Sequence, residues 1–242
     1  MIINNVKSVS SVILLAIFCL LSSCKRDARR IKKSQEDEVD PKMFMQNILL
    51  ADAKAQQSYD IIYKDTYVTW RGEMLLGLKK HEGTIQSSGG KLEVRGNQIT
   101  KGEFIMDMNS FKCTDIEDPE SNRRFVEHLK SDDFLNVEKF SLATFKIKNY
   151  VQNGDVIHVE GILNLRGYSR LIRFVATSHM ENDEFRLVSD EFFIDRSRFA
   201  VSYNIEGTSI GESAKSRIIK NNVALRIHLR ARKRKEPTEV KN

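Results

Sequence analysis

Apolar and polar side chains alternate along residues 223–232, and this period of two is the strongest constraint on the fold. Successive side chains of a β-strand point to opposite faces, so the segment is predicted to be a strand with one buried and one wet face. The buried set would be Val223, Leu225, Ile227 and Leu229, alternating with Ala224, Arg226, His228 and Arg230. The same pattern, with Ile157, Val159, Leu163 and Leu165, surrounds Gly161, where the missing side chain suits a bend or bulge.

Similar alternation recurs from residue 58 onward, interrupted by turn residues. The predicted strands cover residues 66–70, 81–86, 91–95, 99–108, 142–151, 156–166, 170–180, 184–195 and 223–232. The predicted turns lie at Gly96-Asn97-Gln98, Asn153-Gly154, Gly167 and Glu181-Asn182-Asp183.

One segment within the strands has helical spacing. Residues 121–130 are predicted to form a helix that Ser121 caps, with Phe125 and Leu129 on one face. Many antiparallel strands with one helix favour an all-β fold, a closed or nearly closed barrel, because closure removes exposed sheet edges.

The N-terminal segment resembles a bacterial lipoprotein signal. A short apolar run ends in Leu21-Ser22-Ser23-Cys24, which is similar to a lipobox. The run is too short to span ~30 Å of hydrocarbon as a helix, and Lys7 supplies a modest positive region before it. We therefore expect residues 1–23 to be a signal peptide and Cys24 to carry lipid; an ordinary signal peptide or a buried helix is the alternative.

The remaining chain divides by composition. Residues 24–57 are predicted to be a charged tether with a short helix at about 42–56, residues 58–232 the folded domain, and residues 233–242 a basic tail. The chain carries a net charge of +6, with basic residues clustered at both ends. The export signal argues against nucleic acid as the partner. The basic cluster after Cys24 either holds the tether against anionic headgroups or serves solubility.

Cysteine and catalytic patterns are sparse. Cys113 is the single cysteine of the predicted domain, so no internal disulfide is possible, and we expect a buried small side chain rather than a nucleophile. No histidine pair has metal-ligand spacing, and neither a Gly-rich phosphate loop nor a G-x-S-x-G elbow is present. The sequence therefore predicts no enzyme, no cofactor and no metal.

Five motifs in order resemble the YceI-like family. Residues 102–110 are similar to its G-x-F-x-x-D-M-x-S stretch, and residues 128–140 to its H-L-K-S-x-D-F-F-D-V-x-K-Y-P signature. Residues 143–145, 161–167 and 194–199 match its A-x-F, G-x-L-x-L-x-G and I-D-R-x-x-F motifs. Together they cover about residues 58–232.

Three departures from the family pattern bear on the ligand. Ser141 stands where the family has Pro, and Leu135 replaces the second Phe of the signature. The segment between Trp70 and Lys91, which contributes to the barrel mouth in the family, is compact.

The resemblance implies a lipocalin-like antiparallel barrel of about eight strands, with the helix capping one end, around an apolar cavity for a polyisoprenoid or fatty-acyl ligand. The residues expected to face the ligand are Trp70, His81, Phe104, Met106, Met108, Phe145, Leu163, Leu165, Phe193 and Arg196.

Each of these residues also has a plainer interpretation. The phenylalanine and methionine side chains would serve as core packing, and Trp70 would either cover the mouth or plug the base. His81 would meet a headgroup or lie in a solvated turn. Arg196 would pair with an anionic head or tie the barrel end to a loop through an internal ion pair. Phe125, Leu129 and Phe134 are expected to seal the floor.

Two functions follow from these observations. The first is a lipid-binding protein, anchored in the bacterial envelope through Cys24 and facing the periplasm, that transports or stores its lipid without chemistry. The second is an interaction or scaffold lipoprotein whose barrel is filled by its own side chains and whose partner is a protein.

Overall fold

The computed structural model describes residues 42, 45, 46, 56–77, 79–95, 98–207 and 212–235. The chain divides into two compact units, residues 1–50 and 51–242. In the first unit Lys42, Met45 and Gln46 are helical. The rest of the first unit, including the lipobox and Cys24, lies outside the described residues, as do residues 51–55 and 236–242. Within the described parts, no helix has the length and apolar character needed to cross a bilayer.

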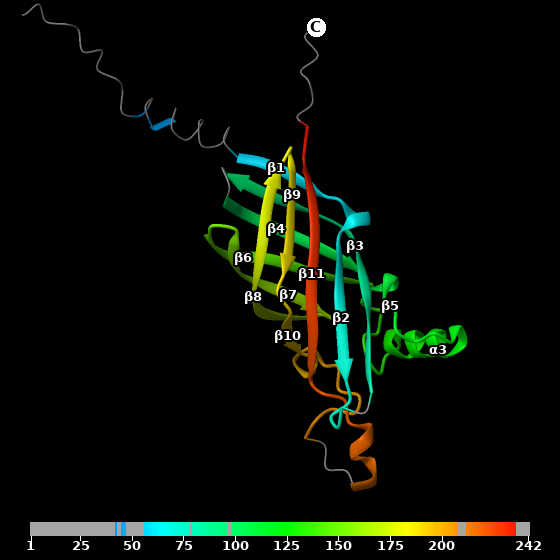
Figure 1. Ribbon diagram of the computed structural model, residues 1–242. Helices are drawn as coiled ribbons and strands as arrows, with labels where there is room; N and C mark the ends of the chain where they lie inside the picture. Colours follow the sequence, from blue (N-terminus) through cyan, green and yellow to red (C-terminus); the bar gives the residue numbers. More distant parts are fainter. Residues whose placement is uncertain are drawn as a thin grey trace, which may run out of the picture. The chain divides into compact units, whose positions relative to one another are not determined.

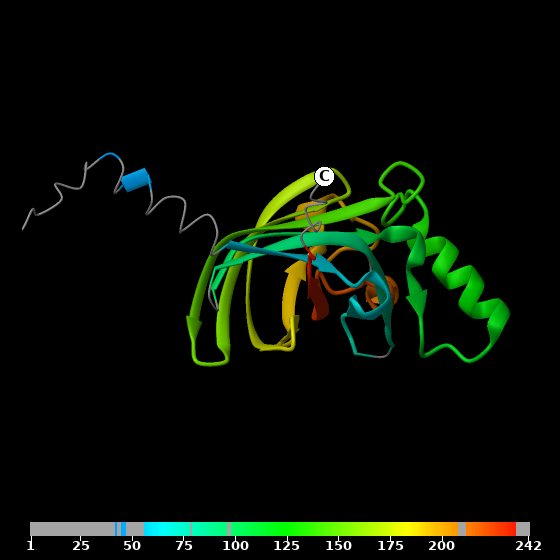
Figure 2. The ribbon, with the colours of Figure 1, turned by 90° about the horizontal axis from the view of Figure 1, so that it is seen from above.

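Eight antiparallel strands close a ring in the second unit (Figures 1 and 2). In ring order they are β2 (Tyr67–Glu73), β3 (Lys80–Arg95), β4 (Gln98–Asp107), β6 (Leu142–Asn153), β7 (Val156–Leu165), β8 (Tyr168–Glu181), β9 (Glu184–Ser189) and β11 (Asn222–Lys233). Strand β11 pairs with both β9 and β2, so the ring has no open seam in its strand order. The expected closed barrel of about eight strands is confirmed.

Three short strands complete the sheet. Strand β1 (Gln56–Ile61) and strand β2 lie one after the other between β3 and β11, separated by the 3-10 turn η1 (Tyr63–Asp65). Strand β10 (Phe192–Asp195) follows β9 along β11, and β5 (Lys112–Cys113) pairs with β3. The sequence pattern predicted neither β1 nor β5.

A register shift within β3 and a break between β9 and β10 change which side chains face inward. Strand β3 is continuous where the sequence predicted two strands, and it is irregular between Ser87 and Gly89. Ile85 faces inward before this point, whereas Leu92 faces inward after it. The predicted strand 184–195 is instead broken into β9 and β10. Because side chains alternate, a shift of one residue moves the whole following set to the other face.

The hairpin turns follow the sequence closely. Arg166 and Gly167 join β7 to β8 with φ of 52° and 78°, and Asn182 and Asp183 join β8 to β9 with φ of 49° and 63°. Two central residues in the left-handed region make the two-residue turn that matches strand twist. Both turns were predicted from their residues.

Gly161 allows a close approach between strands β6 and β7. A Cβ atom there would lie 2.3 Å from Cζ of Phe145 and 2.6 Å from the carbonyl oxygen of Lys146. Opposite it, β6 is irregular between Ile147 and Asn149. The bend or bulge expected at Gly161 is therefore found on the partner strand β6, opposite the glycine.

Helix α3 (Pro119–Lys130) is the predicted helix, but it begins earlier than expected. The N-cap is Asp118, whose carboxylate accepts a hydrogen bond from the backbone N–H of Ser121 (2.8 Å), and Pro119 occupies the first turn. The prediction that Ser121 caps the helix is therefore wrong. The remaining short helices are the 3-10 turns η2 (Met108–Ser110), η3 (Arg196–Phe199) and η4 (Glu212–Arg217).

Candidate ligand-binding cavity

The barrel is hollow at one end. A cavity of about 440 Å³ lies where β2, β10 and helix α3 contribute to the wall, and a smaller one of about 90 Å³ adjoins it deeper in the barrel. Val68, Met106, Leu163 and Leu225 line both. The larger volume falls within the range of small-molecule sites, about 300–1,000 Å³. We call the part of the barrel around this cavity the hollow half.

The other part, the filled half, is closed by its own side chains. A row of aromatic rings crosses the barrel, with centroid distances of 6.4 Å from Phe104 to Phe145, 5.6 Å from Phe145 to Phe174 and 4.9 Å from Phe174 to Phe192. Beyond this row the interior is packed with buried apolar residues, among them Tyr59, Leu92, Val94, Ile157 and Ala176. The expectation of a barrel filled by its own side chains therefore holds for this half of the barrel only.

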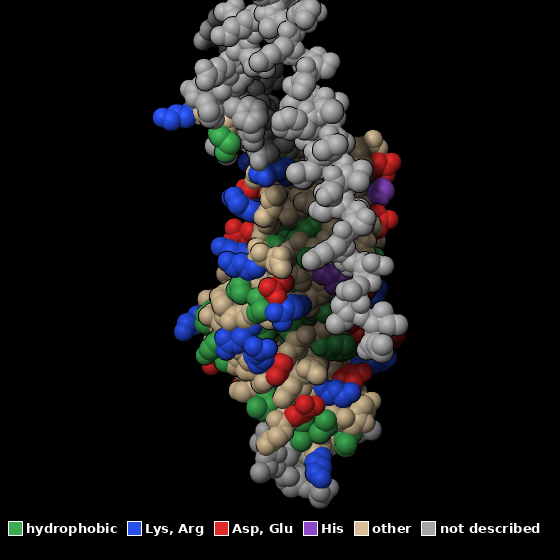
Figure 3. All heavy atoms as spheres, turned by 90° about the vertical axis from the view of Figure 1, so that its left-hand side faces the viewer, with side chains coloured by type: hydrophobic (Ala, Val, Ile, Leu, Met, Phe, Trp, Pro, Cys, Tyr) green, Lys and Arg blue, Asp and Glu red, His purple; other side chains and the backbone are tan. Residues whose placement is uncertain are grey.

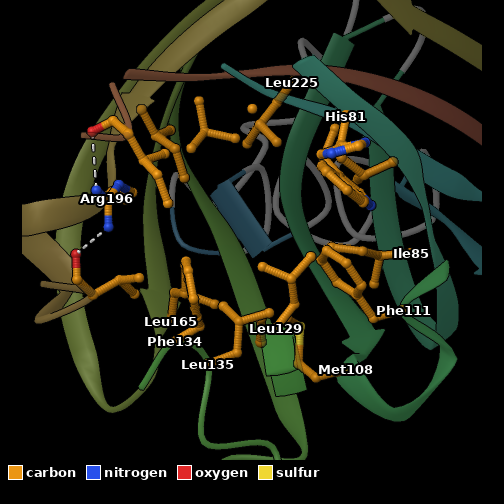
Figure 4. A pocket seen from close by; sticks show the side chains of 18 of the residues that line it. His81, Ile85, Met108, Phe111, Leu129, Phe134, Leu135, Leu165, Arg196 and Leu225 are labelled. Carbon is orange, nitrogen blue, oxygen red and sulfur yellow. Dashed lines mark hydrogen bonds between the residues drawn. The ribbon is translucent and has the colours of Figure 1, made fainter. Parts of the chain in front are cut away.

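The wall of the hollow half is almost wholly apolar. Trp70 is buried, stacks on Phe111 at 4.6 Å and donates its indole N–H to the carbonyl oxygen of Lys112 (3.2 Å). Figure 4 shows Ile85 and Phe111 on one side of the space, with Leu129 and Met108 below it. The residues expected to seal the floor, Phe125, Leu129 and Phe134, all line this cavity.

Arg196 faces the cavity but its guanidinium is already engaged. The side chain is only 5% exposed, and burial lowers its pKa. It donates hydrogen bonds of 3.0–3.3 Å to the carbonyl oxygens of Val201, Asn204, Ile219 and Lys220, two of which Figure 4 shows. The expected internal ion pair is therefore replaced by carbonyl contacts. Arg196 fastens the loop after β10 to the barrel end.

Three other polar side chains mark one end of the cavity. Glu73 accepts a hydrogen bond from Lys220 (2.5 Å), which lowers the pKa of Glu73. Lys79 is exposed and makes no ion pair with any residue that the structure describes. His81 lies half-buried on strand β3, with Nδ1 2.9 Å from Oδ2 of Asp115, so the expectation of a solvated turn histidine is wrong.

Nine of the ten residues expected in the barrel interior line one of the two cavities. They are Trp70, His81, Met106, Met108, Leu163, Leu165 and Arg196 in the larger one, and Phe104 and Phe145 in the smaller one; Met106 and Leu163 belong to both. The prediction for Phe193 is wrong, because this residue lies on the outer face and is 58% exposed. The break between β9 and β10 shifts the alternation by one residue, so Phe192 faces inward in its place.

The sequence did not predict that Phe192, Val201 and Ile219 line the cavities. For Phe192 a signal was available: the adjacent acidic residues Asp190 and Glu191 indicate a break in the strand, because charged pairs are uncommon inside a buried strand. Val201 and Ile219 come from the long connection between β10 and β11, where no periodicity marks an inward side chain.

Comparison with known proteins identifies a family and solved structures that share this architecture. The family model described as YceI-like domain matches residues 59–231. A solved polyisoprenoid binding domain from Saccharophagus degradans aligns with a TM-score of 0.52 and 12% identity, over 74% of this chain and 99% of that one. Burkholderia cenocepacia BcnA aligns with a TM-score of 0.48 and 15% identity, over 70% and 98%. A Campylobacter jejuni YceI protein aligns at 0.42 and 20%, over 57% and 75%. No curated protein matches the sequence.

Proposed function

Because the chain belongs to the YceI-like domain family, we propose that it binds a lipid with a single long apolar chain, a polyisoprenoid or a fatty acyl, in the hollow half of its barrel. The observation that carries the proposal is the cavity of about 440 Å³, whose wall is apolar except at one end. The structural neighbour from Saccharophagus degradans, named as a polyisoprenoid binding domain, supports the same ligand class.

The energetics favour an extended hydrocarbon. Each methylene that moves from water into the cavity contributes roughly 0.8 kcal/mol, so a chain of several methylenes binds without any polar contact. Met106 and Met108 line the wall, and their flexible thioethers adapt to chains of irregular shape. The row of aromatic rings ending at Phe104 would stop the chain before it reaches the filled half.

The polar end of the cavity is the place for a headgroup. Lys79, which makes no ion pair within the described part of the chain, lines the cavity there, as does the half-buried His81. A carboxylate or phosphate at this end would gain a charge-assisted hydrogen bond from Lys79. We assign no chemistry to the site, because Glu73 and Arg196 are already hydrogen-bonded within the protein.

Anchoring is the second part of the proposal. The Leu21–Cys24 motif supports lipidation of Cys24, a position in the bacterial envelope facing the periplasm, and a role in transport or storage of the bound lipid. Metabolic labelling with palmitate should mark the natural chain and leave Cys24→Ser unlabelled. An equally labelled Cys24→Ser chain would contradict the anchor.

The scaffold function rests on different observations. One half of the barrel is filled, and Figure 3 shows basic and acidic side chains interspersed over one outer face, as a surface for a protein partner can have. The larger cavity favours lipid binding over this alternative, because a scaffold gains nothing from an apolar space of that volume.

The single tryptophan gives a direct test. Trp70 lines the larger cavity, so a fatty acid brominated in mid-chain should quench its fluorescence in a saturable way, and unlabelled lipid should reverse the quenching. Ala143→Phe, which places a ring in the cavity, should abolish saturable quenching, whereas Val156→Ala on the exposed face should leave it unchanged. Unsaturable quenching in the natural chain, or unchanged quenching in Ala143→Phe, would contradict binding in this cavity.

A further inference from the structure

We propose that His81, Cys113 and Asp115 form a binding site for one divalent cation of the zinc class. The imidazole nitrogen, the thiol sulfur and a carboxylate oxygen of these three residues all lie within 4.8 Å of one another. The inference does not rest on the lipid proposal, since a cation can bind here whether or not a lipid occupies the barrel, although His81 belongs to both sites.

The pairing of β5 with β3 brings the three side chains together. Gly83 lies opposite Cys113, and the backbone N–H of Thr114 continues the ladder by donating to the carbonyl oxygen of Glu82 (2.9 Å). His81 and Asp115 are the next pair along the ladder. Asp115 follows the end of β5, and its carboxylate contacts both His81 and Cys113, so the three ligand atoms lie together at this end of the ladder.

The hydrogen bonds already present show how close the ligand atoms are. Nδ1 of His81 is 2.9 Å from one carboxylate oxygen of Asp115, and the Cys113 thiol donates to the other at 3.1 Å. A cation held by the three groups would replace these contacts with short metal bonds of about 2.0–2.3 Å, which draws the ligand atoms closer together.

The surroundings fix the ligands in place. The backbone N–H of Glu82 donates to Asp115 (3.0 Å), and the Asn122 side-chain amide of helix α3 donates to the carbonyl oxygens of Cys113 (3.1 Å) and Ile116 (2.9 Å). The His81 ring packs against the ring of Phe125 on α3, with 4.5 Å between the ring centroids. Groups of this kind, outside the ligands themselves, orient metal ligands in established sites.

The donor set determines the class of cation. Thiolate, imidazole and carboxylate are the ligands that zinc combines in four-coordinate sites, whereas magnesium and calcium take oxygen ligands. Three protein ligands leave the fourth position for water or an exogenous group. On binding, the Cys113 thiol gives its proton to solvent and the remaining imidazole proton resides on Nε2 of His81.

The location links the site to the barrel. Cys113 is buried in the cluster of apolar side chains that includes Trp70, and His81 also lines the larger cavity. A bound cation would therefore lie beside the polar end of that cavity.

Cobalt(II) is the probe, because a thiolate ligand gives it a charge-transfer band in the near ultraviolet. The full chain in detergent, with Cys19→Ser and Cys24→Ser so that Cys113 is its single thiol, is titrated with cobalt(II) and then with zinc(II). We expect one equivalent of cobalt, with a thiolate band that zinc removes. Cys113→Ser should lose the band, and Asp115→Asn should bind cobalt at least tenfold more weakly. The control His158→Gln, an exposed histidine elsewhere in the barrel, should keep both.

A second measurement needs no variant at the ligands. X-ray absorption at the zinc edge of the same chain, loaded with one equivalent, should show a single sulfur neighbour at about 2.3 Å together with nitrogen or oxygen neighbours. A zinc shell without sulfur, no cobalt band, or a band that survives in Cys113→Ser would overturn the proposal. None of these outcomes bears on Trp70 quenching by lipid, so the two proposals fail independently.

Discussion

Adding the same side chain to each half of the barrel should change stability in opposite directions. Ala143 on β6 lines the larger cavity, and Ala176 on β8 lies in the filled half with 1% exposure. Both alanines are buried on inward faces of central strands, so Ala143→Leu and Ala176→Leu are a matched pair that differ in the space in front of them.

The magnitudes follow from that space. Three added carbons buried in an empty cavity contribute up to about 2 kcal/mol, reduced by about 0.5–1 kcal/mol for the lost rotamer freedom of leucine. Ala143→Leu should therefore stabilise the lipid-free protein by about 1 kcal/mol. The same carbons forced into the packed core around Ala176 should destabilise it by about 1–3 kcal/mol.

Urea unfolding of the delipidated protein measures both effects, with the slope against denaturant compared between variants to confirm that the transition keeps its character. The expected result is a higher midpoint for Ala143→Leu and a lower one for Ala176→Leu. If Ala143→Leu lowers the midpoint as much as Ala176→Leu does, the hollow half is packed in solution and the reasoning is refuted.

Four further changes test other parts of the account. Gly161→Ala should destabilise by about 1–3 kcal/mol because its Cβ has no room, whereas Gly72→Ala, with no atom within 4 Å of its Cβ, should unfold at nearly the natural urea midpoint; equal midpoints would contradict the close approach. Hydrogen bonds from two arginines lower the pKa of Glu184 to about 2 from its ordinary value of 4.5, so the stability it contributes is present above pH 4.5 and is lost as the pH falls through about 2. Glu184→Gln should flatten that part of the stability curve, measured by urea unfolding between pH 5 and pH 2, and an unchanged slope would count against the pairing. Lys79→Met should remove a preference for a fatty acid over the matching alcohol in the quenching assay, and a preference that persists would exclude Lys79 as the headgroup contact. Arg196→Met should instead lower thermal stability, since it leaves four carbonyl oxygens without their donor, and should keep the preference in the fraction that remains folded.

Local patterns in the sequence predicted most of the barrel. The alternation in β7 and β11 and the glycine- and asparagine-containing turns act over a few residues, and tertiary contacts did not override them. The prediction failed where one residue changes the alternation. The break before Phe192 contains neither glycine nor proline and is marked only by the charged pair Asp190-Glu191. Phe193, which the sequence predicted in the interior, therefore lies on the surface.

The site needed information that no local pattern carries. The strands have the same apolar alternation in the hollow half and in the filled half. Ala143 and Ala176, for example, are both buried inward residues of such strands. The two halves differ only in whether side chains from the opposite wall of the barrel fill the space in front of these residues. The contact between His81 and Asp115 joins residues 34 apart, and it exists because β5 pairs with β3. The family resemblance supplied the closed barrel and its apolar interior, yet the carbonyl contacts of Arg196 depend on a loop of irregular structure.

Mass spectrometry of the protein, purified without removal of bound lipid, tests lipid binding most directly. Native spray should give the mass of the chain plus a ligand, and denaturing spray of the same sample should give the chain alone. The mass difference should match a polyisoprenoid or a fatty acyl, and it should be absent from Ala143→Phe, in which the cavity is occupied by a ring. A bare chain in native spray that stays bare after incubation with a lipid extract would contradict the lipid-binding function and favour the scaffold.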